Sequence, residues 1–293
     1  MYRILFFMKL ALIGGDARMC AVARLFMNTK GTEVRCFSMP EGAPHPQKTL
    51  SDALIGAEAV ILPLPASRDG VHPTTVGGVA SPTLAEIFSR AEEETLVLGG
   101  MLTPPVLAAA GQAEVEIADY YTGEALLLKN AAATAEAAIA MAALDLPVTL
   151  AGTTVAVIGS GRIAGRLLPL LRAMGARILL YARSTAGREA GEDAGAITYA
   201  IRAGEPPEIP SAVRAVFCTV PAMLFPRGCS LPAAGTLFYD LGGGAIDPEW
   251  AKEKGVVLPP SAGLPGRYSP ESAGAYLYTE ILKLLRMKRG ADL

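Results

Sequence analysis

Short apolar runs alternate with longer amphipathic stretches along the chain, and most runs end at a glycine or proline. Runs of this kind occupy 9–13, 59–62, 95–98, 155–158, 177–182, 215–220 and 236–240, and the more mixed stretch 32–37 adds a further predicted strand. Continuous apolar runs are typical of strands that are buried on both faces of a parallel sheet. The pattern therefore predicts an α/β fold with two Rossmann-like, doubly wound domains.

The alanine-rich stretch 122–146 predicts one long helix that joins the two domains, with an active-site cleft between them. We place an N-terminal α/β substrate and catalytic domain at 1–130 and an NAD(P)-binding Rossmann domain at 131–293. The helix predicted at the C-terminus, within 270–293, has an apolar side that allows it to pack back on the first domain.

The strongest local motif is the stretch 153–184, which predicts strand, glycine turn, helix and strand. Gly159 permits a tight turn, and Gly161 lets the backbone approach a pyrophosphate at the start of the helix. The small Ala164 permits close packing of helix on strand. The motif is specific because a strand precedes it and a helix follows it. It predicts a dinucleotide site, with a purely structural turn as the alternative.

The end of the second strand of this unit favours NADP over NAD. The nearest acidic residue is Glu189, whereas Arg183 and Ser184 offer a guanidinium and a hydroxyl to a 2′-phosphate. A solvated loop arginine is the alternative. The residues expected at the cofactor are Gly159, Ser160, Gly161, Arg162, Ile163, Ala182, Arg183, Ser184, Thr219, Val220, Pro221, Asp240 and Gly242. Pro169, inside the predicted helix, is expected to kink it.

Two turns in the first half carry candidates for substrate binding. The turn Gly14–Arg18 opens a helix whose free N–H groups can hold an anion, with Arg18 adding charge. The alternative is an ordinary helix start capped by Asp16. Ser67, Arg68 and, more weakly, His72 follow a strand at the edge where open α/β sheets bind ligands.

Asn130 and Thr134 are spaced i, i+4 and share one face of the long predicted helix. This face would line the predicted cleft, or it would simply pack against neighbouring helices.

Composition narrows the function further. A net charge of −2 gives no indication of a basic nucleic-acid surface or membrane patch. Four isolated cysteines and two histidines predict reduced thiols and no metal. Lys9 interrupts the apolar start, so residues 1–7 resemble a signal peptide only superficially. We expect a soluble, cytoplasmic protein without nucleic-acid or membrane partners.

Several of these motifs, in order, resemble a known family. The residues that carry the resemblance are Gly14-Gly-Asp-Ala-Arg18, Leu62–Ser67, Asn130 to Glu136, Val157–Arg162, Ala182–Ser184, Thr219–Pro221, Asp240-Leu241 and Gly263-Leu-Pro-Gly266. From about Lys9 to Leu285 the chain resembles the A subunit of dipicolinate synthase, which is the dehydrogenase component of the spore enzyme. More distantly it is similar to D-2-hydroxyacid and alanine dehydrogenases.

The resemblance implies an NAD(P)-dependent oxidoreductase. It would oxidise a dihydrodipicolinate-type ring to dipicolinate (pyridine-2,6-dicarboxylate) and pass a hydride to NADP. It implies that the partner is the flavoprotein-like B subunit of dipicolinate synthase. It also implies a homo-oligomer within a hetero-oligomer, and the cytoplasm of the mother cell of a sporulating bacterium. The residues then expected to hold the small dicarboxylate substrate are Arg18, Ser67, Arg68, Asn130 and Thr134.

Two alternatives remain open. The chain could be a non-catalytic NADP-binding scaffold, or a dehydrogenase of another small amino or hydroxy acid. The absence of histidine from Gly263–Gly266 disfavours hydroxyacid chemistry by a histidine–carboxylate pair. No residue stands out as general base, because Glu136, His72 and Asp240 are each weak candidates and water can accept an easily lost proton.

Overall fold

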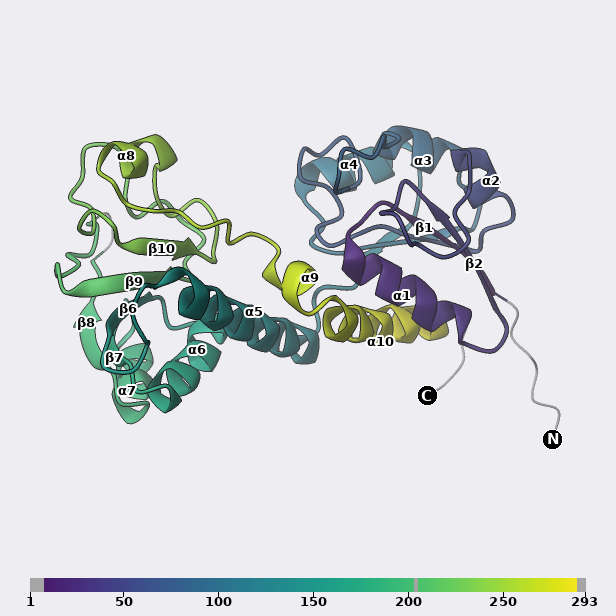
Figure 1. Cartoon of the computed structure of the whole chain (residues 1–293). Helices are drawn as coiled ribbons and strands as arrows, with labels where there is room; N and C mark the ends of the chain where they lie inside the picture. Colours follow the sequence, from purple (N-terminus) through teal and green to yellow (C-terminus); the bar gives the residue numbers. More distant parts are fainter. Residues whose placement is uncertain (1–7, 203–204, 289–293) are drawn as a thin grey trace. The chain divides into compact units, whose positions relative to one another are not determined.

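The computed structural model describes residues 8–202 and 205–288, and its elements are labelled in Figure 1. The chain divides into two compact units. Unit 1 comprises the chain up to Lys129 together with the stretch from Ser269 onward, and unit 2 is Asn130–Tyr268. The apolar start at 1–7 and the end of the predicted last helix at 289–293 lie outside the described residues.

Unit 1 is built on a five-stranded parallel sheet. Its strands are β1 (Met8–Ile13), β2 (Thr32–Phe37), β3 (Ala59–Ile61), β4 (Leu96–Gly99) and β5 (Ile117–Asp119), in the order β2-β1-β3-β4-β5. The order reverses between β1 and β3, which run parallel with Leu12 opposite Ile61. In open α/β sheets ligands bind beyond the carboxyl ends of the strands at such a switch point.

Helices cover both faces of this sheet. They are α1 (Ala17–Met27), α2 (Leu50–Leu54), α3 (Leu84–Arg90), α4 (Pro104–Gln112) and α10 (Pro270–Lys288). One apolar cluster joins the sheet to α1 and α10, and a second joins its other face to α2, α3 and α4. The inner strands β1, β3 and β4 are mainly apolar because both faces are covered, whereas the edge strand β2 buries only Val34 and Cys36.

The C-terminal helix α10 completes the core of unit 1 by packing on α1. A Cβ added at Gly274 would lie 2.5 Å from Ala21 Cβ and 2.8 Å from Arg18 O. The ring centroids of Phe26 and Tyr278 are 4.7 Å apart in an edge-on arrangement. The absence of a side chain at Gly274 is therefore what lets the two helices approach so closely.

Unit 2 is built on a second five-stranded parallel sheet. Its strands are β6 (Thr154–Ile158), β7 (Arg177–Ala182), β8 (Ile197–Ala200), β9 (Val213–Cys218) and β10 (Leu237–Asp240), in the order β10-β9-β6-β7-β8. Counted from β6 this is the order 3-2-1-4-5, which dinucleotide-binding sheets adopt. The predicted α/β fold with two Rossmann-like domains is confirmed.

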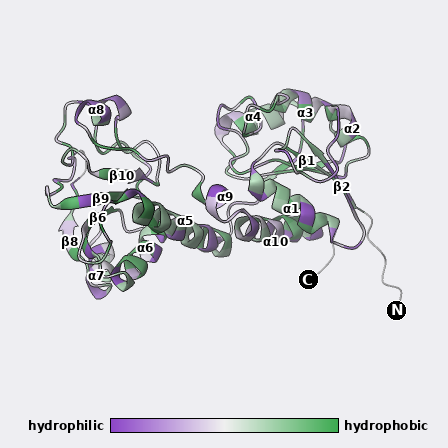
Figure 2. Ribbon diagram, viewed as in Figure 1, coloured by the Kyte–Doolittle hydropathy of each residue, from purple (hydrophilic) through white to green (hydrophobic). Residues whose placement is uncertain are grey.

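The helices of unit 2 are α6 (Arg162–Ala173), α7 (Thr185–Asp193), α8 (Pro248–Glu253), α9 (Leu264–Tyr268) and most of the long α5 (Glu124–Asp145). By length and composition alone α5 is apolar enough to cross a membrane, and Figure 2 shows it hydrophobic on many of its turns. Half of the most apolar stretch of α5 is buried, and Ala135, Ala138 and Ala142 join the core of unit 2. The apolar character of α5 therefore matches that of a core helix.

Pro169 lies inside α6, which still runs without interruption from Arg162 to Ala173. Proline has no N–H, so the carbonyl of Gly165 loses its partner in the helix. Pro169 and Gly165 are both exposed, so water can bind this carbonyl. The exposed position explains how the helix tolerates a residue that costs about 3 kcal/mol in an ordinary interior.

Pro169→Ala is expected to raise the free energy of unfolding of unit 2 by about 2 kcal/mol. The restored helical hydrogen bond outweighs the roughly 1 kcal/mol lost through a more flexible unfolded chain. Urea unfolding followed by circular dichroism measures the change. Pro104→Ala is the control, because Pro104 occupies the first turn of α4, where an N–H has no helical partner. An unchanged or lower stability for Pro169→Ala would contradict this account.

Candidate functional site

The glycine turn after β6 brings two predicted cofactor residues together. Gly159 has a φ of 103° and donates its N–H to Tyr181 O at 2.8 Å. A Cβ at Gly159 would lie 2.4 Å from Thr219 Oγ1. Thr219 follows β9, and its hydroxyl donates to Ile158 O at 3.0 Å. Both the backbone conformation and the neighbouring strand therefore require glycine at position 159.

Gly161 differs from Gly159 because its surroundings are open. It is exposed, and no atom lies within 4 Å of the position that its Cβ would take. It is the N-cap of α6 and, as glycine, offers no side chain to accept a hydrogen bond from the helix start. An uncapped helix start beneath open space is suited to an anionic group such as a pyrophosphate. Arg162 and Ile163 form the first turn of the helix.

The turn between β7 and α7 gathers the groups that were predicted to select NADP. Ser160 and Ser184 lie close together, because a Cβ at Gly187 would be 2.2 Å from Ser160 Oγ and 2.8 Å from Ser184 Oγ. Ser184 Oγ also accepts from Gly187 N at 3.1 Å as the N-cap of α7. Ala182 is buried at the end of β7, and Arg183 is exposed directly after it.

A second guanidinium at this turn was missed by the sequence analysis. Arg188 donates to the carbonyls of Ala182 and Arg183 at 3.2 and 2.9 Å, and to Thr185 Oγ1 at 3.1 Å. These hydrogen bonds stabilise the backbone conformation at Ala182 and Arg183. The signal that could have found it is its position one helical turn past the N-cap Ser184.

The remaining predicted cofactor residues lie at the carboxyl end of β10 and in the loops that follow β9 and β10. Gly242 donates its N–H to Cys218 O at 3.1 Å, and a Cβ there would lie 2.5 Å from the carbonyl carbon of Val220 and 2.9 Å from Pro221 N. Asp240 accepts hydrogen bonds from the N–H groups of the following loop. The structure thus brings these residues to the same carboxyl edge as the glycine turn.

In unit 1, Arg18 is held by the protein itself. It is 6% exposed, its guanidinium binds both carboxylate oxygens of Asp16, and it donates to Leu64 O at 2.7 Å. Asp16 is the N-cap of α1, and its side chain also accepts a hydrogen bond from Arg18 N. This agrees with the alternative prediction of an ordinary helix start capped by Asp16. Arg18 therefore anchors the start of the loop after β3, and contact with substrate stays a prediction.

That loop presents the other predicted substrate residues of unit 1. Ser67 is 3% exposed, donates to Asp69 Oδ1 at 3.0 Å and accepts from Gly70 N at 2.9 Å. Arg68 is exposed, and no hydrogen bond or ion pair of its guanidinium is found within residues 8–202 and 205–288. Ser67 shapes the loop, whereas Arg68 is available to an anion.

Asn130 and Thr134 are joined within α5. Thr134 is 6% exposed and donates from Oγ1 to Asn130 O at 2.8 Å, a contact that threonine commonly makes inside a helix. Their role in substrate binding stays a prediction.

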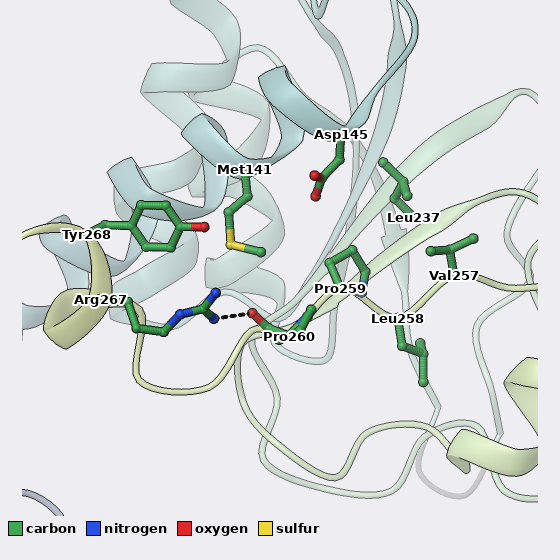
Figure 3. Close-up of a pocket in the computed structure, with 9 residues that line it drawn as sticks. All are labelled: Met141, Asp145, Leu237, Val257, Leu258, Pro259, Pro260, Arg267 and Tyr268. Carbon is green, nitrogen blue, oxygen red and sulfur yellow. Dashed lines mark hydrogen bonds between the residues drawn. The ribbon is translucent and has the colours of Figure 1, made fainter. Parts of the chain in front are cut away.

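A separate cavity of about 530 Å³ lies in unit 2 and includes no predicted site residue. Its lining residues are Met141, Asp145, Leu237, Val257, Leu258, Pro259, Pro260, Arg267 and Tyr268. In Figure 3 the Arg267 side chain extends toward Pro260, whose carbonyl accepts from Nη1 at 2.6 Å. Asp145 accepts from the hydroxyl of Tyr239 at 3.0 Å. The two charged side chains that line this cavity, Asp145 and Arg267, thus both have hydrogen-bond partners within the protein.

The described residues contain no group of three or more His, Cys, Asp or Glu that could hold a metal. All four cysteines are free. Burial raises the pKa of the Cys36 and Cys218 thiols to about 12, so both stay protonated and unreactive near neutral pH.

Comparison with known proteins adds to this geometry. Residues 9–121 match the family model that describes the N-terminal domain of the dipicolinate synthase A subunit. The predicted resemblance to this family is confirmed. The A subunit of dipicolinate synthase from Bacillus subtilis (strain 168) is 25% identical over 286 residues, which cover 95% of this chain and 96% of the relative.

Solved structures show the same fold. The A chain of dipicolinate synthase from Bacillus subtilis has a TM-score of 0.78 at 24% identity, covering 98% of this chain and 99% of its own. The corresponding protein from Bacillus halodurans also scores 0.78, at 20% identity, with 96% and 98% covered. D-lactate dehydrogenase from Escherichia coli scores 0.61 at 17% identity, with 97% and 98% covered.

Proposed function

We propose that this chain is an NAD(P)-dependent oxidoreductase of dipicolinate synthesis. It oxidises a dihydrodipicolinate-type ring to pyridine-2,6-dicarboxylate and passes the hydride to NADP. The observation that carries the proposal is the open, uncapped start of α6 at Gly161, set in a sheet with dinucleotide-binding strand order. The similarity of almost the whole chain to the dipicolinate synthase A subunit supports the choice of substrate.

Each part of the proposed reaction has its own residues. The cofactor supplies the hydride chemistry when it is bound. The start of α6 holds its pyrophosphate, and the turn with Arg183 and Arg188 holds its 2′-phosphate. Arg68, which is exposed at the switch point of unit 1, holds a substrate carboxylate. Aromatisation of the ring supplies driving force, so the protein must mainly position a dianion and accept a proton.

The biological setting is part of the same proposal. The chain acts with the flavoprotein-like B subunit of dipicolinate synthase, as a homo-oligomer within a hetero-oligomer, in the cytoplasm of the mother cell of a sporulating bacterium. The resemblance to the dipicolinate synthase family supports this setting. Co-purification of the chain with the B subunit from sporulating cells tests the partnership.

Arg183→Ala is expected to weaken NADP binding about 10- to 100-fold and to leave NAD binding unchanged. A charge-assisted hydrogen bond to the 2′-phosphate contributes about 1.5–3 kcal/mol, and NAD lacks that phosphate. Calorimetric titration with both cofactors measures the effect. Arg177→Ala is the matched control, because Arg177 is exposed at the opposite end of the same strand. Equal weakening of both cofactors would remove Arg183 from the site.

A substrate panel tests the choice of substrate. The chain, alone and with its flavoprotein-like partner, is incubated with NADP and either a dihydrodipicolinate-type dicarboxylate, a simple hydroxy acid or an amino acid. We expect NADPH formation with the cyclic dicarboxylate only. Turnover of a simple hydroxy or amino acid instead would overturn the proposed substrate.

A further inference from the structure

A histidine–carboxylate pair lies in the loop that follows β3. His72 Nδ1 is 2.8 Å from Asp69 Oδ2. The other oxygen of Asp69 accepts from Val71 N and His72 N, each at 2.8 Å, and from Ser67 Oγ at 3.0 Å. The backbone N–H of His72 and then its ring hold the pKa of Asp69 well below its usual range. Asp69 is therefore a fixed, ionised acceptor.

This pairing determines which nitrogen of His72 is free. A carboxylate can only accept, so the neutral imidazole must carry its proton on Nδ1. Nε2 is then an unprotonated acceptor on the far side of the ring. The His72 side chain is 45% exposed and that of Asp69 is 55% exposed, so a ligand can reach Nε2. The arrangement matches that of a general base oriented by a carboxylate.

The position of the pair also points to a ligand. The loop folds back on the turn after β1, because Gly15 N donates to Thr74 O at 2.7 Å. The pair therefore lies beside the switch point between β1 and β3. Arg68, the exposed guanidinium without a partner among the described residues, precedes Asp69 directly.

Two further features lie at the same edge of the sheet. The hydroxyl of Thr74 is buried and has no hydrogen-bond partner within the described parts of the chain. Such groups are rare in folded proteins and call for a further donor or acceptor. Met101, which follows β4, is 51% exposed in a left-handed conformation with a φ of 54°. Its backbone N–H donates to Asp119 Oδ1 at 3.2 Å, so the protein itself holds this turn and presents the apolar side chain to solvent.

We propose that His72 is the general base of the reaction and that Asp69 is its positioning residue. This inference rests on the proposed function. When the ring is oxidised, one C–H bond breaks and both of its electrons leave as hydride to NADP. A second bond to hydrogen in the ring breaks, its electron pair forms the new double bond, and its proton goes to Nε2 of His72. The imidazolium that forms is stabilised by Asp69.

Other charged groups face this ring. Glu86, in the first turn of α3, interacts electrostatically with His72. Its carboxylate accepts from Thr83 N at 2.8 Å and closes the capping box of that helix. Glu86 and Asp69 are thus the carboxylates near this ring, and Arg68 is a cation on the same loop.

The two histidines of the chain provide an internal control for binding. In imidazole NMR spectra of the whole chain, His72 is titrated with pyridine-2,6-dicarboxylate, and His45 is followed as the reference. We expect the His72 signals to shift saturably and those of His45 to stay unchanged. Unmoved His72 signals throughout the titration would overturn the proposal, whether or not the chain shows turnover.

Turnover gives the second test. His72→Gln is expected to lower kcat about 100- to 10,000-fold, the range that general base catalysis contributes, with KM and NADP affinity unchanged. Added imidazole is expected to restore part of the activity of His72→Ala, because the site is exposed. Asp69→Asn keeps an oxygen for the backbone N–H groups, so it is expected to lower kcat and change the tautomer signals of His72 without unfolding the loop.

The outcomes separate the two proposals. If the wild-type chain turns over the dicarboxylate and the His72→Gln variant has the wild-type kcat, then the assignment of His72 as general base is wrong and the proposed function stands. If wild-type chain, with or without its flavoprotein-like partner, shows no turnover, the proposed function fails, and the NMR titration still decides whether His72 meets a dicarboxylate.

Discussion

Replacing Gly161 by valine is expected to weaken NADP binding at least 100-fold while unit 2 remains as stable as in the wild type. The backbone at Gly161 is extended, with φ −82° and ψ −165°, which valine adopts readily. No atom lies within 4 Å of the added Cβ, so the fold is not disturbed. The isopropyl group instead fills the space that the pyrophosphate needs above the start of α6.

The size of this effect follows from the contacts that would be lost. Hydrogen bonds between backbone N–H groups and a charged phosphate contribute about 1.5–3 kcal/mol each, and two of them account for a loss of at least about 100-fold. Calorimetric titration measures the affinity, and urea unfolding measures the stability. Gly165→Ala is the matched control, because Gly165 is also open and lies on the same helix. Wild-type NADP affinity in Gly161→Val would show that the turn is only structural.

The second large effect is expected on the stability of unit 1. Gly274→Val in α10 should lower the free energy of unfolding by at least about 3 kcal/mol, because overpacking a tight contact costs about 1–3 kcal/mol and the added atoms meet rigid ones. The first of these atoms would lie 2.5 Å from Ala21 Cβ and 2.8 Å from a backbone oxygen on α1. The helices would have to separate and expose Leu277 and Ile281, which are now buried.

The control for this prediction is Gly111→Ala in α4. Its Cβ would meet nothing within 4 Å, and alanine favours helices, so stability should rise by about 0.4–1 kcal/mol. Urea unfolding of both full-length variants makes the comparison. A Gly274→Val chain as stable as wild type would mean that α10 does not need to lie close to α1.

The strands and the glycine turn were predictable because each depends on local sequence. A strand buried on both faces requires a continuous apolar run, as in Val155–Ile158, and only glycine fits the left-handed backbone at position 159. The run Val256–Leu258 resembles such a strand, yet only Val257 forms a bridge, with Leu237. Pairing at a sheet edge depends on geometry that the run itself does not encode.

The chemistry of the site was harder to predict because it depends on which side chains meet. Arg18 was predicted at an anion site, and the structure shows its guanidinium bound to Asp16, two residues before it, while its contact with substrate stays a prediction. His72 was a weak candidate as a lone histidine, and Asp69 gives it an orientation and a free nitrogen. The spacing of Asp69 and His72 was visible in the sequence, but only a turn at Gly70 brings the two together.

The measurement that tests the central claim most directly is the product balance of the purified chain. The chain is incubated with NADP and a dihydrodipicolinate-type substrate, with and without its flavoprotein-like partner, and NADPH and pyridine-2,6-dicarboxylate are quantified together. We predict that both products appear in equal amounts with the chain alone. NADPH without the aromatic dicarboxylate, or neither product under any condition, would contradict the account.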